Sequence, residues 1–167
     1  MVVILGFDPG LDGAIALVSA DSDLMKVWDM PSLDRTQGKG REVNPYLLSD
    51  IVDEARELAG HHKVECVIEQ VGVRPGEGAA GAFKFGDGFG VLRGVVGANH
   101  LTCRYVRPQV WKKYHGLLKK EKSASRALAM EKWPESRELF VRVKDADRAE
   151  AALLAQFGLT VAGWKVE

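Results

Sequence analysis

Short runs of hydrophobic residues, each closed by polar or turn-forming residues, predict five β-strands. These runs are VVILGF (2–7), GAIALVSA (13–20), LMKVWDM (24–30), KVECVIE (63–69) and LTCRYV (101–106). The Asp-Ser-Asp cluster between the second and third runs is typical of a tight turn, so we expect the first three strands to pair as an antiparallel meander. The last two runs each follow a helical segment and are predicted to be parallel strands.

Hydrophobic residues that recur at helical spacing predict four α-helices. Asn44 has the features of a helix N-cap, and Gly60 is expected to end that helix. The predicted helices span 45–59, 83–99, 123–133 and 145–158, the last with Gly158 just past its end, and the segments at 31–43 and 71–81 are predicted loops. This order of elements is typical of an α/β domain in which helices flank a mixed sheet.

The helix predicted at 83–99 carries a stripe of glycines. Gly86, Gly90 and Gly94 fall four residues apart and therefore lie on one face. Such a face lets a helix approach a sheet or a partner helix closely. The segment also contains GDGFG, but no Rossmann-type strand leads into it, so helix packing is favoured over dinucleotide binding.

The size and composition of the chain indicate one globular unit. We expect a single domain over residues 1–167, because this length is enough for one sizeable core. Hydrophobic residues make up 46% and charged residues 28%, and we find no apolar run of membrane-spanning length and no signal-peptide pattern. Cys66 and Cys103 lack metal-ligand spacing and are interpreted as buried thiols of a cytoplasmic protein.

The distribution of charge is more informative than its total. The formal net charge is zero, which by itself argues against nucleic-acid binding. Basic residues nevertheless concentrate between Arg104 and Lys122, a segment that holds seven of them and a single acid, Glu121. This local excess fits two interpretations, a surface that holds phosphate groups or an ordinary solvated face.

Four acidic residues stand where predicted elements end or begin. Asp8 and Glu69 close two strands, while Asp147 and Glu150 lie three residues apart on one face of the last helix. If the two strands are neighbours, their acids emerge at one edge of the sheet, where α/β proteins place their sites. The last helix, crossing that edge, would bring all four carboxylates together.

Four carboxylates this close would repel one another unless some were protonated or a cation neutralised them. Oxygen ligands alone select hard ions such as Mg²⁺ or Mn²⁺, and two such ions about 4 Å apart are suited to phosphodiester hydrolysis. Asp8, Asp147 and Glu150 also have structural explanations, as turn and helix-start residues. Glu69 is harder to explain in this way, because an ionised side chain in an apolar strand is costly to bury unpaired.

Four segments in order resemble the motifs of RuvC-type Holliday-junction resolvases, in the ribonuclease H-like superfamily. They are GFDPGLDGAIALV, VIEQVG, KFGDGFGVLRGVV and DADRAEAALLA, and the resemblance spans residues 3–159. It implies a ribonuclease H-like fold with a five-stranded mixed sheet, a homodimer, and a site with two divalent metal ions. It also implies an activity, the cutting of branched DNA by paired symmetric nicks.

The same resemblance assigns the metal ligands. It implies Asp8 as the first ligand, Glu69 as the second, and two acids three residues apart for the rest. Asp147 and Glu150 fit that spacing. Glutamate at the last position departs from the family's usual aspartate but still supplies carboxylate oxygen. Asp145 is the competing candidate if the helix register differs by half a turn.

Basic and aromatic side chains are expected to contact the DNA in this interpretation. The basic residues are Arg74, Lys84, Arg93, Lys112, Lys113, Lys119, Lys120 and Lys122. Many resolvases carry an aromatic residue just after the EQV motif, where this sequence has Gly72. Phe83, Phe85 or Phe89 could stack on bases in its place, or could pack in the core or a dimer interface.

The sequence leaves three other functions open. A related nuclease that acts on structured RNA would begin with a similar strand and Asp-x-Gly element. An actin-like kinase or ATPase shares that element but needs two domains, for which 167 residues are too few. A non-catalytic DNA-binding module would retain the fold, although the full set of acids argues against it.

Overall fold

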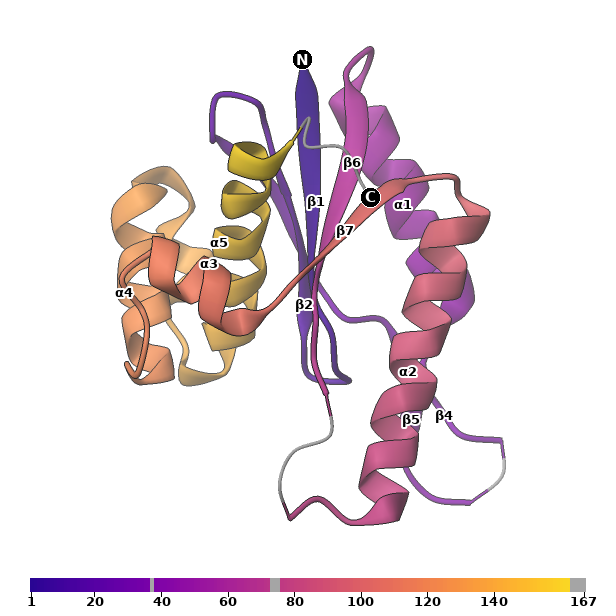
Figure 1. The fold of residues 1–167 in the computed structure, drawn as a ribbon. Coiled ribbons are helices and arrows are strands. Elements are labelled where there is room, and N and C mark those ends of the chain that lie inside the picture. The colour runs from indigo at the N-terminus through magenta and orange to yellow at the C-terminus, as the bar shows by residue number, and fades with distance from the viewer. Residues whose placement is uncertain (37, 73–75, 163–167) are drawn as a thin grey trace.

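The computed structural model describes residues 1–36, 38–72 and 76–162, and its centre is a five-stranded sheet (Figure 1). The strands are β1 (Val2–Asp8), β2 (Ala14–Val18), β3 (Leu24–Asp29), β6 (Lys63–Glu69) and β7 (Thr102–Val106). They lie in the order β3-β2-β1-β6-β7, with β1, β2 and β3 antiparallel and with β6 and β7 parallel to β1. The predicted mixed sheet is therefore confirmed.

One face of the sheet is covered by the C-terminal half of the chain (Figure 1). Helix α5 (Ala146–Val161) lies directly on β1, β2 and β6. Helices α3 (Pro108–Tyr114) and α4 (Lys122–Lys132) pack against α5. Two 3₁₀ helices, η1 (Pro134–Phe140) and η2 (Val143–Asp145), connect α4 to α5. The start of α5 thereby comes to the carboxyl edge of the sheet.

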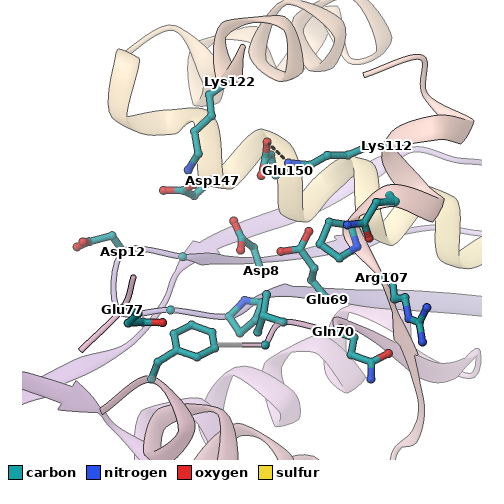
Figure 2. Close-up of a pocket in the computed structure, with 18 residues that line it drawn as sticks. Asp8, Asp12, Glu69, Gln70, Glu77, Arg107, Lys112, Lys122, Asp147 and Glu150 are labelled. Atoms are coloured by element: carbon teal, nitrogen blue, oxygen red, sulfur yellow. Dashed lines mark hydrogen bonds and ion pairs between the residues drawn. The ribbon is translucent and has the colours of Figure 1, made fainter. Parts of the chain in front are cut away.

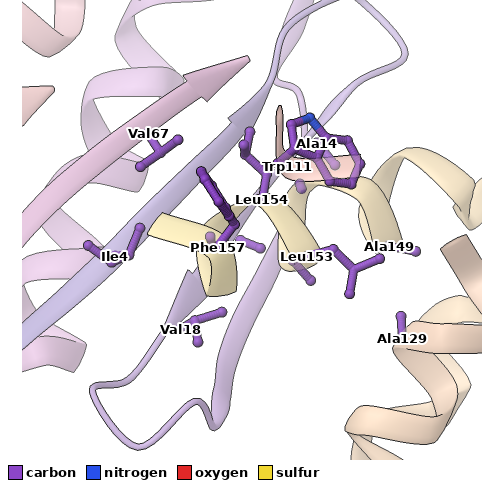
Figure 3. Close-up of a cluster of buried hydrophobic side chains, with 14 of the residues drawn as sticks. Ile4, Ala14, Val18, Val67, Trp111, Ala129, Ala149, Leu153, Leu154 and Phe157 are labelled. Carbon is purple, nitrogen blue, oxygen red and sulfur yellow. The ribbon is translucent and has the colours of Figure 1, made fainter. Parts of the chain in front are cut away.

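The core beneath α5 depends on small residues that let the helix approach the strands (Figure 3). Gly158 lies inside the helix, and a β-carbon there would be 2.6 Å from Cγ2 of Ile4 and 2.7 Å from Cγ2 of Val67. Gly6 of β1 faces the same helix, and a β-carbon there would be 2.7 Å from the carbonyl oxygen of Ala151. The prediction that the last helix ends before Gly158 is wrong, because this glycine serves close packing instead of helix termination.

Two longer helices, α1 (Pro45–Ala59) and α2 (Ala79–Ala98), cover the other face (Figure 1). The predicted start and end of α1 are confirmed. The Asn44 side chain accepts backbone hydrogen bonds from the first turn, and Gly60 ends the helix with φ of 60°. Alternate residues of each strand point to opposite faces, so the two helical layers enclose separate cores.

The glycine stripe of α2 faces away from the sheet. Gly86, Gly90 and Gly94 are exposed, and apart from the adjacent backbone of the helix itself a β-carbon at any of them would meet nothing within 4 Å among the described residues. Helix α2 reaches the core through Leu92 and Val96 instead. The prediction that the glycine stripe packs against the sheet is therefore wrong. The alternative, that it packs against a partner helix, stays a prediction.

Short elements account for the other differences from the sequence prediction. The predicted loop at 31–43 contains a hairpin of β4 (Ser32–Asp34) and β5 (Arg41–Val43), whose three-residue strands are too short to show an alternating pattern. Helix α2 was predicted to begin at residue 83 but begins at Ala79, because the alanines before Phe83 are strong helix formers. Helix α3 and the two 3₁₀ helices were not predicted.

The two cysteines lie opposite each other on β6 and β7, and both are free. Cys66 is buried, as predicted, and its burial raises the pKa of its thiol, whereas Cys103 is only half-buried. Within the described ranges, we find no helix that is long and apolar enough to cross a membrane.

Candidate metal centre

The ends of two neighbouring strands bring the first two acids together. In the parallel pair of β1 and β6, Phe7 lies opposite Ile68, so Asp8 and Glu69 leave the sheet side by side. Their carboxylates point into one pocket, which Figure 2 shows. Glu69 is 8% exposed and Asp8 is half-buried, so both are largely removed from water.

The first two turns of α5 supply the other two acids. Asp147 and Glu150 lie on the helix face that meets the strand ends (Figure 2). One carboxylate oxygen from each of Asp8, Asp147 and Glu150 lies within 4.8 Å of the others. Glu69 lines the same pocket but does not belong to this closest set. All four acids selected from the sequence thus meet in one place.

Asp145, the competing candidate, is engaged elsewhere. It is only 1% exposed, and the Arg142 side chain donates to its Oδ1 from Nη2 at 2.8 Å and from Nε at 3.0 Å. The Arg142 backbone N–H donates to Oδ2 at 2.8 Å. Burial alone would raise the pKa of Asp145, but these hydrogen bonds lower it overall. Asp145 therefore caps η2 and holds the start of α5 in place.

The carboxylates of the pocket destabilise one another's charged forms. Burial raises the pKa of Asp8, and the neighbouring charges of Glu69, Asp147 and Glu150 raise it further. Burial also raises the pKa of Glu69, against the opposing hydrogen bond from Trp111. Clustered acids with raised pKa values need protons or cations to be stable. The electrostatics of the pocket therefore favour the binding of a cation.

The sequence analysis assigned Lys112 and Lys122 to DNA binding. In the structure both lysines form hydrogen bonds with carboxylates of the pocket. Lys122 donates to Asp147, and Lys112 donates from Nζ to Oε1 of Glu150 at 3.1 Å. Burial lowers the pKa of Lys122, but its contact with Asp147 gives a net rise. The hydroxyl of Ser125 also donates to Glu150 Oε1, at 3.2 Å. These contacts hold Asp147 and Glu150 in place and partly balance their charge.

The remaining basic residues lie outside the pocket. Lys113 is exposed on α3, Lys119 and Lys120 are exposed between α3 and α4, and Lys84 and Arg93 are exposed on α2. Arg93 stacks over the ring of Tyr105, with its guanidinium 5.7 Å from the ring centre. Arg74 lies outside the described residues. A role for these side chains in DNA binding stays a prediction.

The three phenylalanines of α2 occupy different environments. Phe85 lines the pocket, whereas Phe83 is 72% exposed near the helix start. Phe89 is half-buried and packs edge-on against Tyr105, with ring centres 6.2 Å apart. The core interpretation therefore suits Phe89, and Phe83 and Phe85 are the ones that a ligand can reach.

The pocket encloses about 690 Å³ and includes residues that sequence reasoning did not assign to it. Among them are Asp12, Gln70, Glu77, Arg107 and Gln109. Four of them lie in loops and Gln109 lies at the start of α3, so they give no periodic signal, and only the fold brings the five together. Trp111 was also missed, although its indole N–H donates to Oε1 of Glu69 at 2.8 Å.

The donor set fits a hard divalent cation. Asp8, Glu69, Asp147 and Glu150 offer only carboxylate oxygens, the ligand type that Mg²⁺, Mn²⁺ and Ca²⁺ prefer. The group of Asp8, Asp147 and Glu150 has the closeness that a shared ion requires. A divalent ion would also remove the mutual repulsion that raises the pKa of Asp8.

Comparison with solved structures identifies the class of fold. The chain is similar to Thermus thermophilus RuvC in complex with a Holliday-junction substrate, with a TM-score of 0.59 and 14% identity over 96% of this chain and 95% of that one. It is also similar to a second Thermus thermophilus RuvC structure, with a TM-score of 0.57 and 15% identity over 95% of both chains. No protein-family model and no curated protein matches the sequence. The fold is thus RuvC-like, within the ribonuclease H-like class.

Proposed function

We propose that this chain is a divalent-metal-dependent endonuclease that resolves four-way DNA junctions by paired, symmetric nicks. One observation carries the proposal: oxygens of Asp8, Asp147 and Glu150 lie within 4.8 Å of one another, beside Glu69, at the edge of a RuvC-like sheet. In further support, one of the similar RuvC structures is a complex with a Holliday-junction substrate.

In this proposal Asp8, Glu69, Asp147 and Glu150 would hold two Mg²⁺ or Mn²⁺ ions. Such ions, when bound, lower the pKa of a water molecule and stabilise the leaving 3′-oxygen. The four side chains stand on two adjacent strand ends and on a helix packed tightly against them. Ligands on rigid elements keep their geometry better than ligands on loops, which favours a catalytic role over an incidental acidic patch.

Basic residues around the pocket would bind the DNA backbone. Lys112, Lys122 and Arg107 line the pocket itself, where they can contact the phosphates next to the scissile bond. The predicted contacts beyond it are Arg74, Lys84, Arg93, Lys113, Lys119 and Lys120. Because such contacts release counterions, we expect the affinity for a junction to fall steeply as the salt concentration rises.

A homodimer is part of the proposal, because symmetric nicks on two strands need two equivalent sites. The exposed face of α2 with Gly86, Gly90 and Gly94 is available for a second copy, since glycines allow two helices to approach closely. Sedimentation of the pure protein measures this directly. A monomer that still makes paired nicks would remove the dimer from the proposal.

The function is tested with a synthetic four-way junction in the presence and absence of Mg²⁺, with the nicks mapped on each strand. We expect nicks at symmetric positions only when the metal is present. Cleavage of structured RNA, with the junction left intact, would favour the RNA-processing alternative. Tight junction binding without any cleavage in Mg²⁺ or Mn²⁺ would favour the non-catalytic module.

Asp8→Asn tests the site assignment in the same assay. The amide has the shape of the carboxylate but lacks its charge, so we expect cleavage to be abolished while junction binding persists. Asp50→Asn is the matched control, because Asp50 is exposed on α1, on the opposite face of the sheet. Cleavage that survives in Asp8→Asn would overturn the assignment of Asp8.

A further inference from the structure

One proposed ligand, Glu69, is held differently from the others. Asp147 and Glu150 receive hydrogen bonds from the cationic side chains of Lys122 and Lys112. Glu69 receives its hydrogen bond from a neutral donor, the indole N–H of Trp111, at 2.8 Å from Oε1. Among the described residues, no other hydrogen bond reaches the carboxylate of Glu69.

This difference matters for a site that must bind a cation. A lysine that pairs with a carboxylate neutralises the charge an incoming metal ion would use, so it competes with the ion. An indole can only donate, and it carries no charge. The Trp111 N–H therefore fixes one oxygen of Glu69 without placing a cation beside it, and it leaves the second oxygen for the pocket.

The indole is itself held rigidly. Trp111 is 1% exposed and belongs to the core that α5 forms with the sheet (Figure 3). The ring of His115 lies edge-on to it, with ring centres 6.3 Å apart, and the Lys112 ammonium lies 5.1 Å from the indole centre. A donor locked by packing restricts the rotation of its acceptor, which is how outer residues orient the ligands of metal sites.

We infer that Trp111 is a positioning residue of the metal centre, whose indole N–H sets the orientation of Glu69 for a divalent ion. The inference rests on the proposed function, because it takes Glu69 to be a metal ligand. It also links α3 to the site, since Trp111 and Lys112 are consecutive residues that contact carboxylates from β6 and α5. Helix α3 thus ties two ligand-bearing elements together.

The test is Trp111→Phe, with Mn²⁺ binding to the DNA-free protein measured by calorimetry. Phenylalanine fills much of the same space but cannot donate, so we expect the affinity for Mn²⁺ to fall roughly 10- to 100-fold, as for other lost outer contacts of metal ligands. The Mg²⁺ concentration for half-maximal junction cleavage should rise in parallel, while junction binding without metal stays unchanged.

Trp133→Phe is the matched control. Trp133 is also buried, at 6% exposure, and its indole N–H also donates one hydrogen bond, to the Ser22 carbonyl oxygen at 2.8 Å. Its partner lies in the β2–β3 turn, away from the carboxylates. If the inference holds, both variants lose stability but only Trp111→Phe loses Mn²⁺ affinity. Equal Mn²⁺ affinities in Trp111→Phe and the wild type, or equal losses in the two variants, would overturn it.

A second replacement covers the case in which Trp111→Phe does not fold. Benzothienylalanine at position 111 keeps the shape of the indole with sulfur in place of N–H, and it should reproduce the loss of Mn²⁺ affinity in a protein of near-normal stability. Cleavage by the wild type tests the proposed function separately. If this replacement binds Mn²⁺ more weakly and the wild type cuts no junction, the inference is supported and the proposed function is rejected. If this replacement binds Mn²⁺ normally and the wild type cuts junctions, the inference is rejected and the proposed function is supported.

Discussion

The two helical layers of this protein meet the sheet in opposite ways. Helix α5 lies so close to the strands that Gly158 and Gly6 leave no space for a β-carbon, and ten further residues along it are buried. Helix α2 has glycines too, but only Leu92 and Val96 are buried along its length. The same residue type therefore marks a tight contact in one layer and an uncovered surface in the other.

The difference corresponds to what each layer does. In the proposed metal site the carboxylates of α5 must lie within a few ångströms of two strand ends, which requires a helix whose distance from the sheet is fixed by direct contact. Helix α2 contributes one pocket residue, Phe85, and presents a bare face to solvent. Close contact with the sheet thus fixes the position of α5, whereas the exposed glycine face of α2 is accessible to a partner.

The start of α5 gives the largest expected effect, because two aspartates two residues apart have separate tasks there. We expect Asp147→Asn to lower junction cleavage at least about 100-fold through loss of a proposed metal ligand, with little loss of stability. Asp145→Asn should instead lower the free energy of unfolding by about 1–3 kcal/mol, because it weakens the hydrogen bonds from Arg142. Cleavage rates and urea unfolding of both variants check this.

The opposite result would contradict the separate roles assigned to Asp147 and Asp145. Full cleavage by Asp147→Asn, together with loss of cleavage by a stably folded Asp145→Asn, would make Asp145 the metal ligand. The register of α5 would then differ from the one described here.

Gly158→Ala tests the tight contact of α5. Its β-carbon would lie 2.6 Å from Ile4 and 2.7 Å from Val67, so the helix must move outward or the strands must shift. We expect a net loss of about 1–2 kcal/mol, since two contacts this short place the overpacking cost in the upper part of its usual range of about 1–3 kcal/mol, against a gain in helix propensity of about 1 kcal/mol. Thermal unfolding should show a melting temperature lower by about 2–8 °C. An unchanged melting temperature would show that α5 lies farther from the sheet.

Gly90→Ala is the matched change in α2, and its expected effect is the smallest. Nothing described lies within 4 Å of the new β-carbon, so the change should stabilise the monomer by about 0.5–1 kcal/mol through helix propensity alone. If the stripe meets a partner helix, the same methyl group should weaken the dimer. Urea unfolding at low protein concentration measures the first effect, and sedimentation measures the second. A loss of monomer stability would contradict the open face described for α2.

Much of this fold and site could be predicted from local patterns. The strand ends at Asp8 and Glu69 follow from apolar runs, and the pairing of Asp147 with Glu150 follows from helical spacing. Hydrogen bonds between residues distant in the chain could not be predicted. The indole of Trp111 reaches a carboxylate 42 positions away, and nothing in PQVWKKYHG distinguishes it from a core residue.

The two structural uses of glycine were the other source of error in the prediction of helix ends. A glycine ends a helix when the chain needs a positive φ, as at Gly60, and sits inside a helix when a neighbour needs its space, as at Gly158. Both uses look the same in a sequence. The hairpin at 32–43 was missed because its strands are only three residues long.

Ion pairs join that hairpin to the β1–β2 loop, which lines the pocket, and to helix α2. Arg41 pairs with Asp12 at 2.7 Å, and Arg35 pairs with Asp87 of α2 at 3.8 Å. These ion pairs are at least partly exposed to solvent, and each contributes no more than about 1 kcal/mol. Salt screens such exposed pairs, so we expect rising ionic strength to weaken both contacts. We expect Asp8, Glu69, Asp147 and Glu150 to keep their positions when these contacts weaken, because they stand on the central sheet and on the tightly packed α5.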